Sequence, residues 1–132
     1  MHKETAENYL RAIYHIQEEK GTVKSIDLCR YLHIGKSSIS EMIRNLAEKN
    51  LVCLNPYSTI RLTKKGLSRS MEITRKHRLI EAFLSEFLGI KSSLHEEAHR
   101  LEHAFSEESI GSIRKMVADS KHCPHGKPIP GG

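Results

Sequence analysis

Apolar side chains recur every three or four positions along most of the chain, which is the spacing that places them on one face of a helix. This pattern predicts helices over residues 4–20, 25–32, 36–50 and 63–88, a further helix that carries residues 95–103, and a last one over 106–119. Glycines and a short turn at residues 33–35 separate several of these segments. Two shorter runs, residues 51–54 and 59–62, have the composition of strands and predict a β-hairpin.

The order of these elements is helix, helix, turn, helix and hairpin, which is the order of a winged helix-turn-helix. The helices that follow predict a second, all-helical module, so we expect a mostly α fold. The expected domains are the winged helix-turn-helix at residues 1–72, a helical domain at 73–120 and a tail rich in proline and glycine at 121–132.

Polar residues at the predicted helix starts can accept hydrogen bonds from free backbone amides. Three helices have a candidate cap of this kind: Ser25, Thr63 and Ser106. Ser93 and Glu96 have the spacing of a capping box for the helix that carries residues 95–103. Gly66 lies in the first turn of the long helix, where it predicts a loose start.

The chain has 132 residues and a formal net charge of +5, which favours an acidic partner such as nucleic acid. Its three cysteines, Cys29, Cys53 and Cys123, form no C-x-x-C pair, and their sparse, odd number indicates a reducing intracellular setting. No apolar run reaches the ~20 residues that a membrane span needs. The N-terminus is too polar for a secretory signal. We therefore expect a cytoplasmic protein without a membrane partner.

The third predicted helix has the features of a DNA-recognition helix. Its first turn consists of small and polar residues, which let the backbone approach a duplex, and free amides at a helix N-terminus bind phosphate. The candidates for DNA contact in this helix are Lys36, Ser37, Ser38, Ser40, Glu41 and Arg44. The hairpin and the residues after it add Tyr57, Ser58, Thr59, Arg61, Lys64 and Lys65. Each residue alone fits an ordinary solvated face, but the combined pattern predicts double-stranded DNA as a partner.

Histidines and carboxylates are concentrated in the predicted helical domain. The candidate metal ligands are His77, Glu81, His95, His99, Glu102 and His103. The last four fall within an arc of about 100° on one helix, and the first two are four residues apart on the long helix. Imidazole and carboxylate groups aimed in one direction suit a first-row transition metal. Cys123 and His125 in the tail are ligand types that zinc accepts, and they form an additional candidate site.

Four segments carry a resemblance to a known family: residues 6–14 (AENYLRAIY), 75–79 (RKHRL), 95–103 (HEEAHRLEH) and 126–130 (GKPIP). In this order they resemble the diphtheria toxin repressor and manganese transport regulator family of metal-dependent repressors. The resemblance implies a prokaryotic homodimer that binds palindromic operator DNA when loaded with Fe(II) or Mn(II) and represses metal-uptake genes. Iron-responsive members often carry a third, SH3-like domain after the proline-rich segment, and we expect none here.

Carried over by position, the resemblance implies two metal sites. The regulatory site would use Asn8, His99, Glu102 and His103. The ancillary site would use His77, Glu81 and His95. In this assignment the regulatory metal would be held by both modules, which would fix the first helix and set the spacing of the recognition helices of the dimer.

Two of these positions depart from better-known members of that family. Asn8 stands where Met or Asp is usual, and His99 stands where Cys or Glu is usual. A neutral Asn and an extra imidazole remove negative charge and enrich nitrogen, which favours Fe(II), with Mn(II), Zn(II), Co(II) or Ni(II) as alternatives. Arg11 replaces a carboxylate of the manganese-responsive members, which argues against their two-metal cluster.

Two other functions fit parts of the sequence. Residues 95–99 match the H-E-x-x-H pattern of zinc hydrolases, with Glu96 as the base. No third ligand follows at the required spacing, and Glu96 is also the expected partner of the Ser93 cap, so we expect no enzyme and no small-molecule substrate. The other alternative is a winged-helix repressor without a metal requirement, whose histidines are structural or sense pH.

Overall fold

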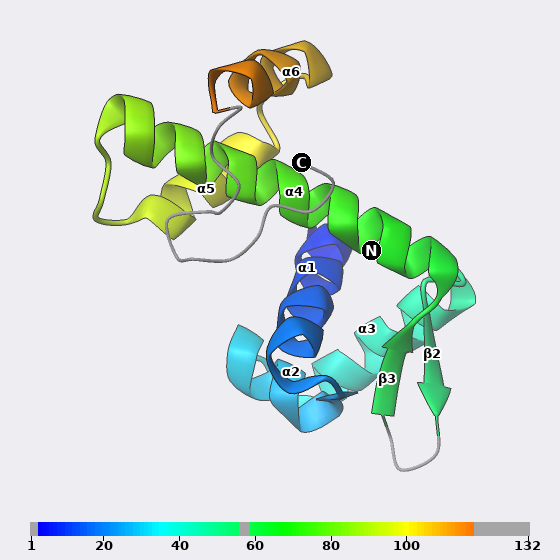
Figure 1. Cartoon of the computed structure of the whole chain (residues 1–132). Coiled ribbons are helices and arrows are strands. Elements are labelled where there is room, and N and C mark those ends of the chain that lie inside the picture. The colour runs from blue at the N-terminus through cyan, green and yellow to red at the C-terminus, as the bar shows by residue number, and fades with distance from the viewer. Residues whose placement is uncertain (1–2, 56–58, 118–132) are drawn as a thin grey trace. The chain divides into compact units, whose positions relative to one another are not determined.

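A computed structural model describes residues 3–55 and 59–117 of the chain (Figure 1). The fold is mostly helical with one small antiparallel sheet, which confirms the expected fold class. The chain divides into two compact units, residues 1–71 and 72–132. Four residues that were candidates from the sequence lie outside the described residues: Tyr57, Ser58, Cys123 and His125.

The first unit has the elements of a winged helix-turn-helix. It contains α1 (Lys3–Lys20), α2 (Ser25–Leu32), α3 (Lys36–Glu48), β1 (Val23–Lys24), β2 (Val52–Asn55) and β3 (Thr59–Leu62), and α4 (Lys64–Leu88) begins in it. The turn between α2 and α3 starts at His33, which adopts a left-handed conformation with φ of 56°. The apolar residues that recur at helical spacing face the core, as expected. The fully buried side chains include Leu10, Ile13, Leu28, Ile39 and Leu46.

The sheet of this unit has three strands in the order β1-β3-β2, and not only the expected hairpin. β2 and β3 pair antiparallel, with Val52 opposite Leu62. On its other edge β3 pairs with β1, where Val23 lies opposite Ile60 and both side chains are buried. β1 is two residues long, which is too short to give an alternating pattern in the sequence.

Two of the expected helix caps are confirmed. The Oγ1 atom of Thr63 accepts a hydrogen bond from the Gly66 N–H at 3.0 Å, at the start of α4. The Oγ atom of Ser106 accepts one from the Ser109 N–H at 3.1 Å, at the start of α6.

The caps expected at Ser25 and Ser93 are wrong. α2 is capped from inside its first turn, where the Oδ2 atom of Asp27 accepts a hydrogen bond from the Lys24 N–H at 2.9 Å. Ser93 adopts a left-handed conformation with φ of 57° and its side chain makes no cap hydrogen bond, so the capping box with Glu96 does not form.

The loose helix start expected at Gly66 is also wrong. Gly66 packs directly against the backbone of Leu51, and a Cβ atom added to it would lie 1.8 Å from the Leu51 carbonyl oxygen. The same oxygen accepts a hydrogen bond from the Thr63 N–H at 3.1 Å. The glycine therefore permits a close approach between the start of α4 and the start of the hairpin.

The second unit is built from the rest of α4, α5 (Leu94–Glu102) and α6 (Glu107–Met116). α4 ends before Gly89, whose φ of 67° is one that glycine adopts without strain. One apolar cluster joins the three helices, and its buried members are Leu79, Ile80, Ala82, Leu84, Leu94, Ala98, Ile110, Ile113 and Val117. In Figure 1, α5 and α6 accordingly lie against the C-terminal part of α4. Among the described residues, no helix combines the length and the apolar character that crossing a bilayer requires.

Candidate metal centres and nucleic-acid interface

The described part of the second unit gathers the six candidate metal ligands into two clusters, each with two histidines and one glutamate. The first, which we call the α4–α5 cluster, consists of His77, Glu81 and His95. The second, the α5 cluster, consists of His99, Glu102 and His103. In each cluster one donor atom per residue lies within 4.8 Å of the others. Two imidazoles and one carboxylate at this spacing fit a divalent transition metal, since these are ligands that such metals accept.

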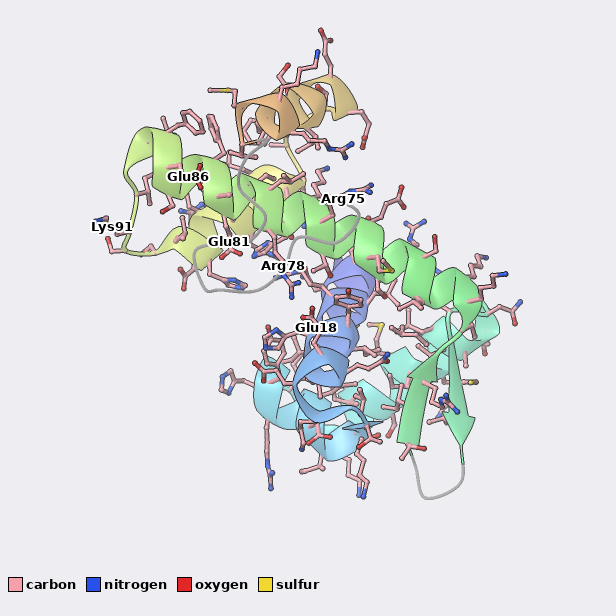
Figure 2. The ribbon with its side chains drawn as sticks, viewed as in Figure 1. Glu18, Arg75, Arg78, Glu81, Glu86 and Lys91 are labelled. Atoms are coloured by element: carbon pink, nitrogen blue, oxygen red, sulfur yellow. The ribbon has the colours of Figure 1, made fainter. Side chains whose placement is uncertain are left out.

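The α4–α5 cluster is formed by two buried residues on one face of α4 and one residue of α5. His77 and Glu81 are one turn apart, and Figure 2 shows Glu81 on the stretch of α4 that runs alongside α5. The Nε2 atom of His77 lies 3.2 Å from Nδ1 of His95 and 3.5 Å from Oε1 of Glu81. The His95 side chain is 52% exposed, so the cluster is closed on the α4 side and open on the α5 side.

The α5 cluster lies at the C-terminal end of α5. The Oε1 atom of Glu102 is 3.2 Å from Nδ1 of His99 and 3.4 Å from Nε2 of His103. Glu102 is buried, with 4% of its side chain exposed. His103 follows the last residue of the helix and keeps a right-handed helical backbone, so the three side chains retain their helical spacing.

Asn8, the remaining residue that the resemblance assigns to a metal, lies on α1 in the first unit. Its Oδ1 atom is buried and has no hydrogen-bond partner among the described residues. A buried carbonyl oxygen is costly to leave without a partner, and a metal would satisfy it. The role of Asn8 as a ligand stays a prediction.

The polar face of α3 is open to solvent, as a recognition helix requires. Its six candidates for DNA contact are all exposed, namely Lys36, Ser37, Ser38, Ser40, Glu41 and Arg44. The opposite face is buried through Ile39, Ile43 and Leu46. In the hairpin and just after it, Arg61 and Lys64 are also exposed.

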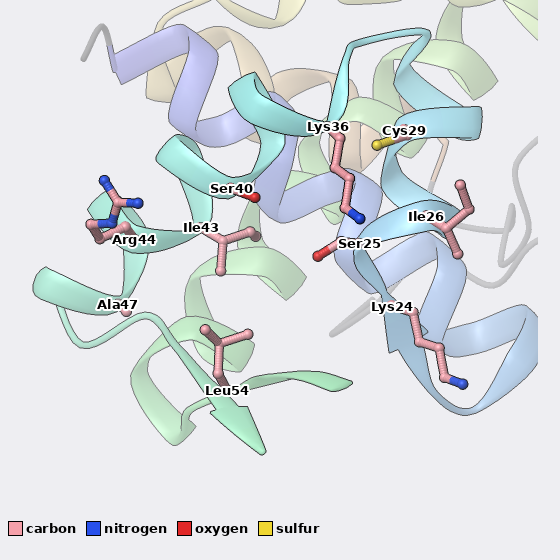
Figure 3. Close-up of a pocket in the computed structure, with 10 residues that line it drawn as sticks. All are labelled: Lys24, Ser25, Ile26, Cys29, Lys36, Ser40, Ile43, Arg44, Ala47 and Leu54. Carbon is pink, nitrogen blue, oxygen red and sulfur yellow. The ribbon is translucent and has the colours of Figure 1, made fainter. Parts of the chain in front are cut away.

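A groove of about 590 Å³ lies between α2, α3 and β2 (Figure 3). Among the described residues, every charged side chain that lines it is a cation, and these are Lys24, Lys36 and Arg44. Its lining is partly apolar and includes Ile26 and Leu54, which are 52% and 58% exposed. Figure 3 shows the Lys36 side chain extending into the space between α3 and α2.

Three residues of this groove, Lys24, Ile26 and Leu54, were not among the candidates for DNA contact that the sequence indicated. Lys24 directly precedes α2, and a basic residue at a helix N-terminus is a signal that would have made it a further candidate for phosphate contact. Leu54 had no comparable signal, because a leucine in a strand is more often part of the core.

The fold and these clusters define a class of protein: a winged helix-turn-helix unit joined in one chain to a helical unit with histidine and carboxylate side chains placed for metal. Comparison with known proteins gives the family. Residues 1–60 match the family described as the iron dependent repressor, N-terminal DNA binding domain. Residues 63–131 match the iron dependent repressor, metal binding and dimerisation domain. The chain therefore belongs to the iron-dependent repressor family.

Individual relatives agree with this assignment. The chain is 31% identical over 129 residues to the diphtheria toxin repressor of Corynebacterium glutamicum, an alignment that covers 97% of this chain and 57% of that protein. It is 36% identical over 120 residues to an uncharacterised HTH-type transcriptional regulator of Methanocaldococcus jannaschii, covering 89% of this chain and 96% of that one. A solved manganese-dependent transcriptional repressor in complex with manganese is 36% identical with a TM-score of 0.85, and the match covers 96% of this chain and 59% of that one. The chain thus spans a little over half the length of several relatives that it matches.

The zinc hydrolase alternative is set aside, because the family is one of transcriptional repressors and not of enzymes. The structure gives a physical reason as well. His95 and His99, the two histidines of the H-E-x-x-H match, belong to different clusters.

Proposed function

We propose that this chain is a transcriptional repressor of metal-uptake or metal-homeostasis genes, with a divalent metal as corepressor. The observation that carries the proposal is the presence of two compact histidine and carboxylate clusters in the same chain as a winged helix-turn-helix with a cationic groove. In this proposal the first unit binds DNA, and the second binds metal and forms the homodimer.

On the DNA side, the exposed polar face of α3 would enter the major groove of a double-stranded, palindromic operator. Lys36 and Arg44 on α3, and Lys24 before α2, are placed around one groove where they would meet phosphate. Two-fold symmetry of the dimer would place the half-sites about one helical turn, or a multiple of it, apart. A cytoplasmic location follows from this role in a prokaryote.

On the metal side, the α4–α5 cluster would hold one ion and the α5 cluster another. When bound, each ion would act as a Lewis acid that neutralises a buried glutamate and ties the imidazoles to it. Asn8 would be a further ligand of the regulatory site. The donor set of two imidazoles and one carboxylate favours Fe(II), which this combination commonly binds, with Mn(II), Zn(II), Co(II) or Ni(II) as alternatives.

The proposal can be tested without knowing the operator sequence. Double-stranded oligonucleotides of random sequence are selected on the purified chain under anaerobic conditions, once with Fe(II) and once with a chelator. We expect a palindromic sequence to be enriched in the Fe(II) selection and not in the chelator selection. Enrichment of the same sequence with the chelator would favour the metal-independent repressor, and no enrichment in either arm would contradict DNA binding.

The selected sequence then allows a test of the ligands by fluorescence anisotropy at fixed salt. His103→Ala should abolish the metal-dependent part of the affinity for DNA. His15→Gln is the matched control, since it removes a histidine of α1 that belongs to neither cluster. A full metal response in His103→Ala would contradict the assignment of the α5 cluster.

A further inference from the structure

The geometry points to a second role for Glu102: we propose that this residue is both a ligand of the α5 cluster and the positioning residue that prepares His77, in the other cluster, to bind its metal. The inference rests on the proposed function, since it requires that both clusters bind metal. It concerns one buried carboxylate that lies between two sites.

The two carboxylate oxygens of Glu102 face different clusters. Its Oε1 atom faces the α5 cluster, at 3.2 Å from Nδ1 of His99 and 3.4 Å from Nε2 of His103. Its Oε2 atom lies 2.9 Å from Nδ1 of His77, which is a residue of the α4–α5 cluster. Glu102 and His77 are each only 4% exposed, so water does not compete strongly for this contact.

This contact determines which nitrogen of His77 carries the proton. An ionised carboxylate can only accept hydrogen bonds, so Nδ1 of His77 must be the donor to Glu102. A neutral imidazole has one N–H, and the lone pair of the other nitrogen is then free for a metal. That other nitrogen is Nε2, which is the atom that faces Glu81 at 3.5 Å and His95 at 3.2 Å. Glu102 thus selects the tautomer of His77 that the α4–α5 cluster needs.

A substitution of Glu102 should therefore change the metal affinity of both clusters. Outer partners that orient a metal-ligating histidine typically contribute about 10- to 100-fold to metal affinity. His99 and His103 approach Oε1 of Glu102, whereas His77 approaches Oε2. Removing the first two histidines should therefore leave the contact with His77, and with it the α4–α5 cluster, intact.

The first experiment isolates the α4–α5 cluster in the double variant His99→Ala/His103→Ala of the full chain. Zn(II) affinity is measured by calorimetry with a competing chelator. Adding Glu102→Leu to this background should weaken Zn(II) binding by about 10- to 100-fold, because Nδ1 of His77 loses its acceptor. Adding Glu102→Gln should restore most of the affinity, since an amide oxygen can still accept the Nδ1–H hydrogen bond.

Zn(II) binding that is as tight with Glu102→Leu as in the background would overturn the inference. Circular dichroism establishes whether the leucine variant is folded. A second measurement does not depend on that variant: ¹⁵N NMR of the Zn(II)-loaded double variant should show the metal on Nε2 of His77 and the proton on Nδ1. The opposite arrangement would also overturn the inference. If the double variant and the wild-type chain both fail to bind Zn(II), the proposed metal-binding function fails instead.

Discussion

Replacing Gly66 with alanine should destabilise the first unit. Gly66 is the third residue of α4, and its Cα atom faces the backbone of Leu51 just before β2. An added Cβ would lie 1.8 Å from the Leu51 carbonyl oxygen and 2.8 Å from the carbonyl carbon. Both are backbone atoms, so no side-chain rotation can relieve the contact.

The magnitude follows from the displacement that the methyl group requires. A carbon atom normally approaches a carbonyl oxygen no closer than about 3.3 Å, so α4 and Leu51 must separate by roughly 1.5 Å. That movement breaks the hydrogen bond from the Thr63 N–H to Leu51 and strains the one from Thr63 Oγ1 to the Asn50 oxygen, each with a net value of about 1 kcal/mol. Overpacking adds about 1–3 kcal/mol. The better helix propensity of alanine offsets up to about 1 kcal/mol of this loss. We expect a net loss in the free energy of unfolding of about 2–4 kcal/mol.

Urea unfolding followed by tyrosine fluorescence is the appropriate assay. The chain has no tryptophan and all of its four tyrosines lie before residue 72, so the signal reports on the first unit alone. Gly35→Ala is the matched control, because nothing lies within 4 Å of its Cβ position, and it should change the free energy of unfolding by less than about 1 kcal/mol. A Gly66→Ala variant as stable as the wild-type chain would refute the close approach to Leu51.

Three further predictions follow from other contacts. Asp27→Asn should lower the stability at neutral pH, because the hydrogen bond from Lys20 holds the pKa of Asp27 below its usual value. The stability that a lowered pKa contributes is present above the unfolded-state pKa and is lost as the pH falls through the folded-state pKa. The melting temperatures of the variant and the wild type should therefore converge in acid. Ser106→Ala should cost about 1 kcal/mol of stability in chemical unfolding followed by circular dichroism, since it removes the cap of α6. Leu88→Glu should convert the proposed dimer to a monomer in sedimentation velocity, because this leucine is 57% exposed in the unit that matches a dimerisation domain.

Each of these predictions has a control or an outcome that contradicts it. A difference between Asp27→Asn and wild type that persists unchanged into acid would exclude the Asp27 carboxylate as its source. Ser109→Ala leaves the backbone amide that Ser106 caps in place, so it should cost less than Ser106→Ala. Leu54→Glu places the same charge on a leucine that is 58% exposed in the first unit, and should leave the dimer intact.

The helices could be predicted because their apolar spacing is a local property of the sequence. The features that were missed depend on contacts between distant segments. β1 exists because Val23 lies opposite Ile60, which is 37 positions away in the chain. The need for a glycine at position 66 arises only where α4 meets Leu51. The cap of α2 was assigned to the wrong residue for a more local reason. Ser25 and Asp27 are both good capping residues, and the Asp27 carboxylate, two residues later, is the one that accepts the hydrogen bond.

The candidate metal ligands could be predicted as a set, but their grouping could not be derived from periodicity. His95 and His99 fall on the same side of α5, one turn apart, and local geometry alone would join them. The packing of α5 along α4 places His95 next to His77, which leaves His99 with Glu102 and His103. The contact between Glu102 and His77 has the same origin, because 25 positions separate these residues.

Because α5 is short, the contacts of the two clusters affect the position of this helix as well as metal binding. An isolated helix of nine residues is not stable in water, and α5 lacks the Ser93 cap that would support its first turn. Its apolar contacts with the cluster of α4 and α6 come from the buried Leu94 and Ala98 in the first half of the helix and from the partly buried Leu101 in the second half. The second half is held by Leu101 together with a buried polar contact, the pair between Glu102 and His77. In the proposed function, a metal in the α4–α5 cluster would therefore strengthen the same contact that fixes the end of α5, and the position of the α5 cluster would depend on it.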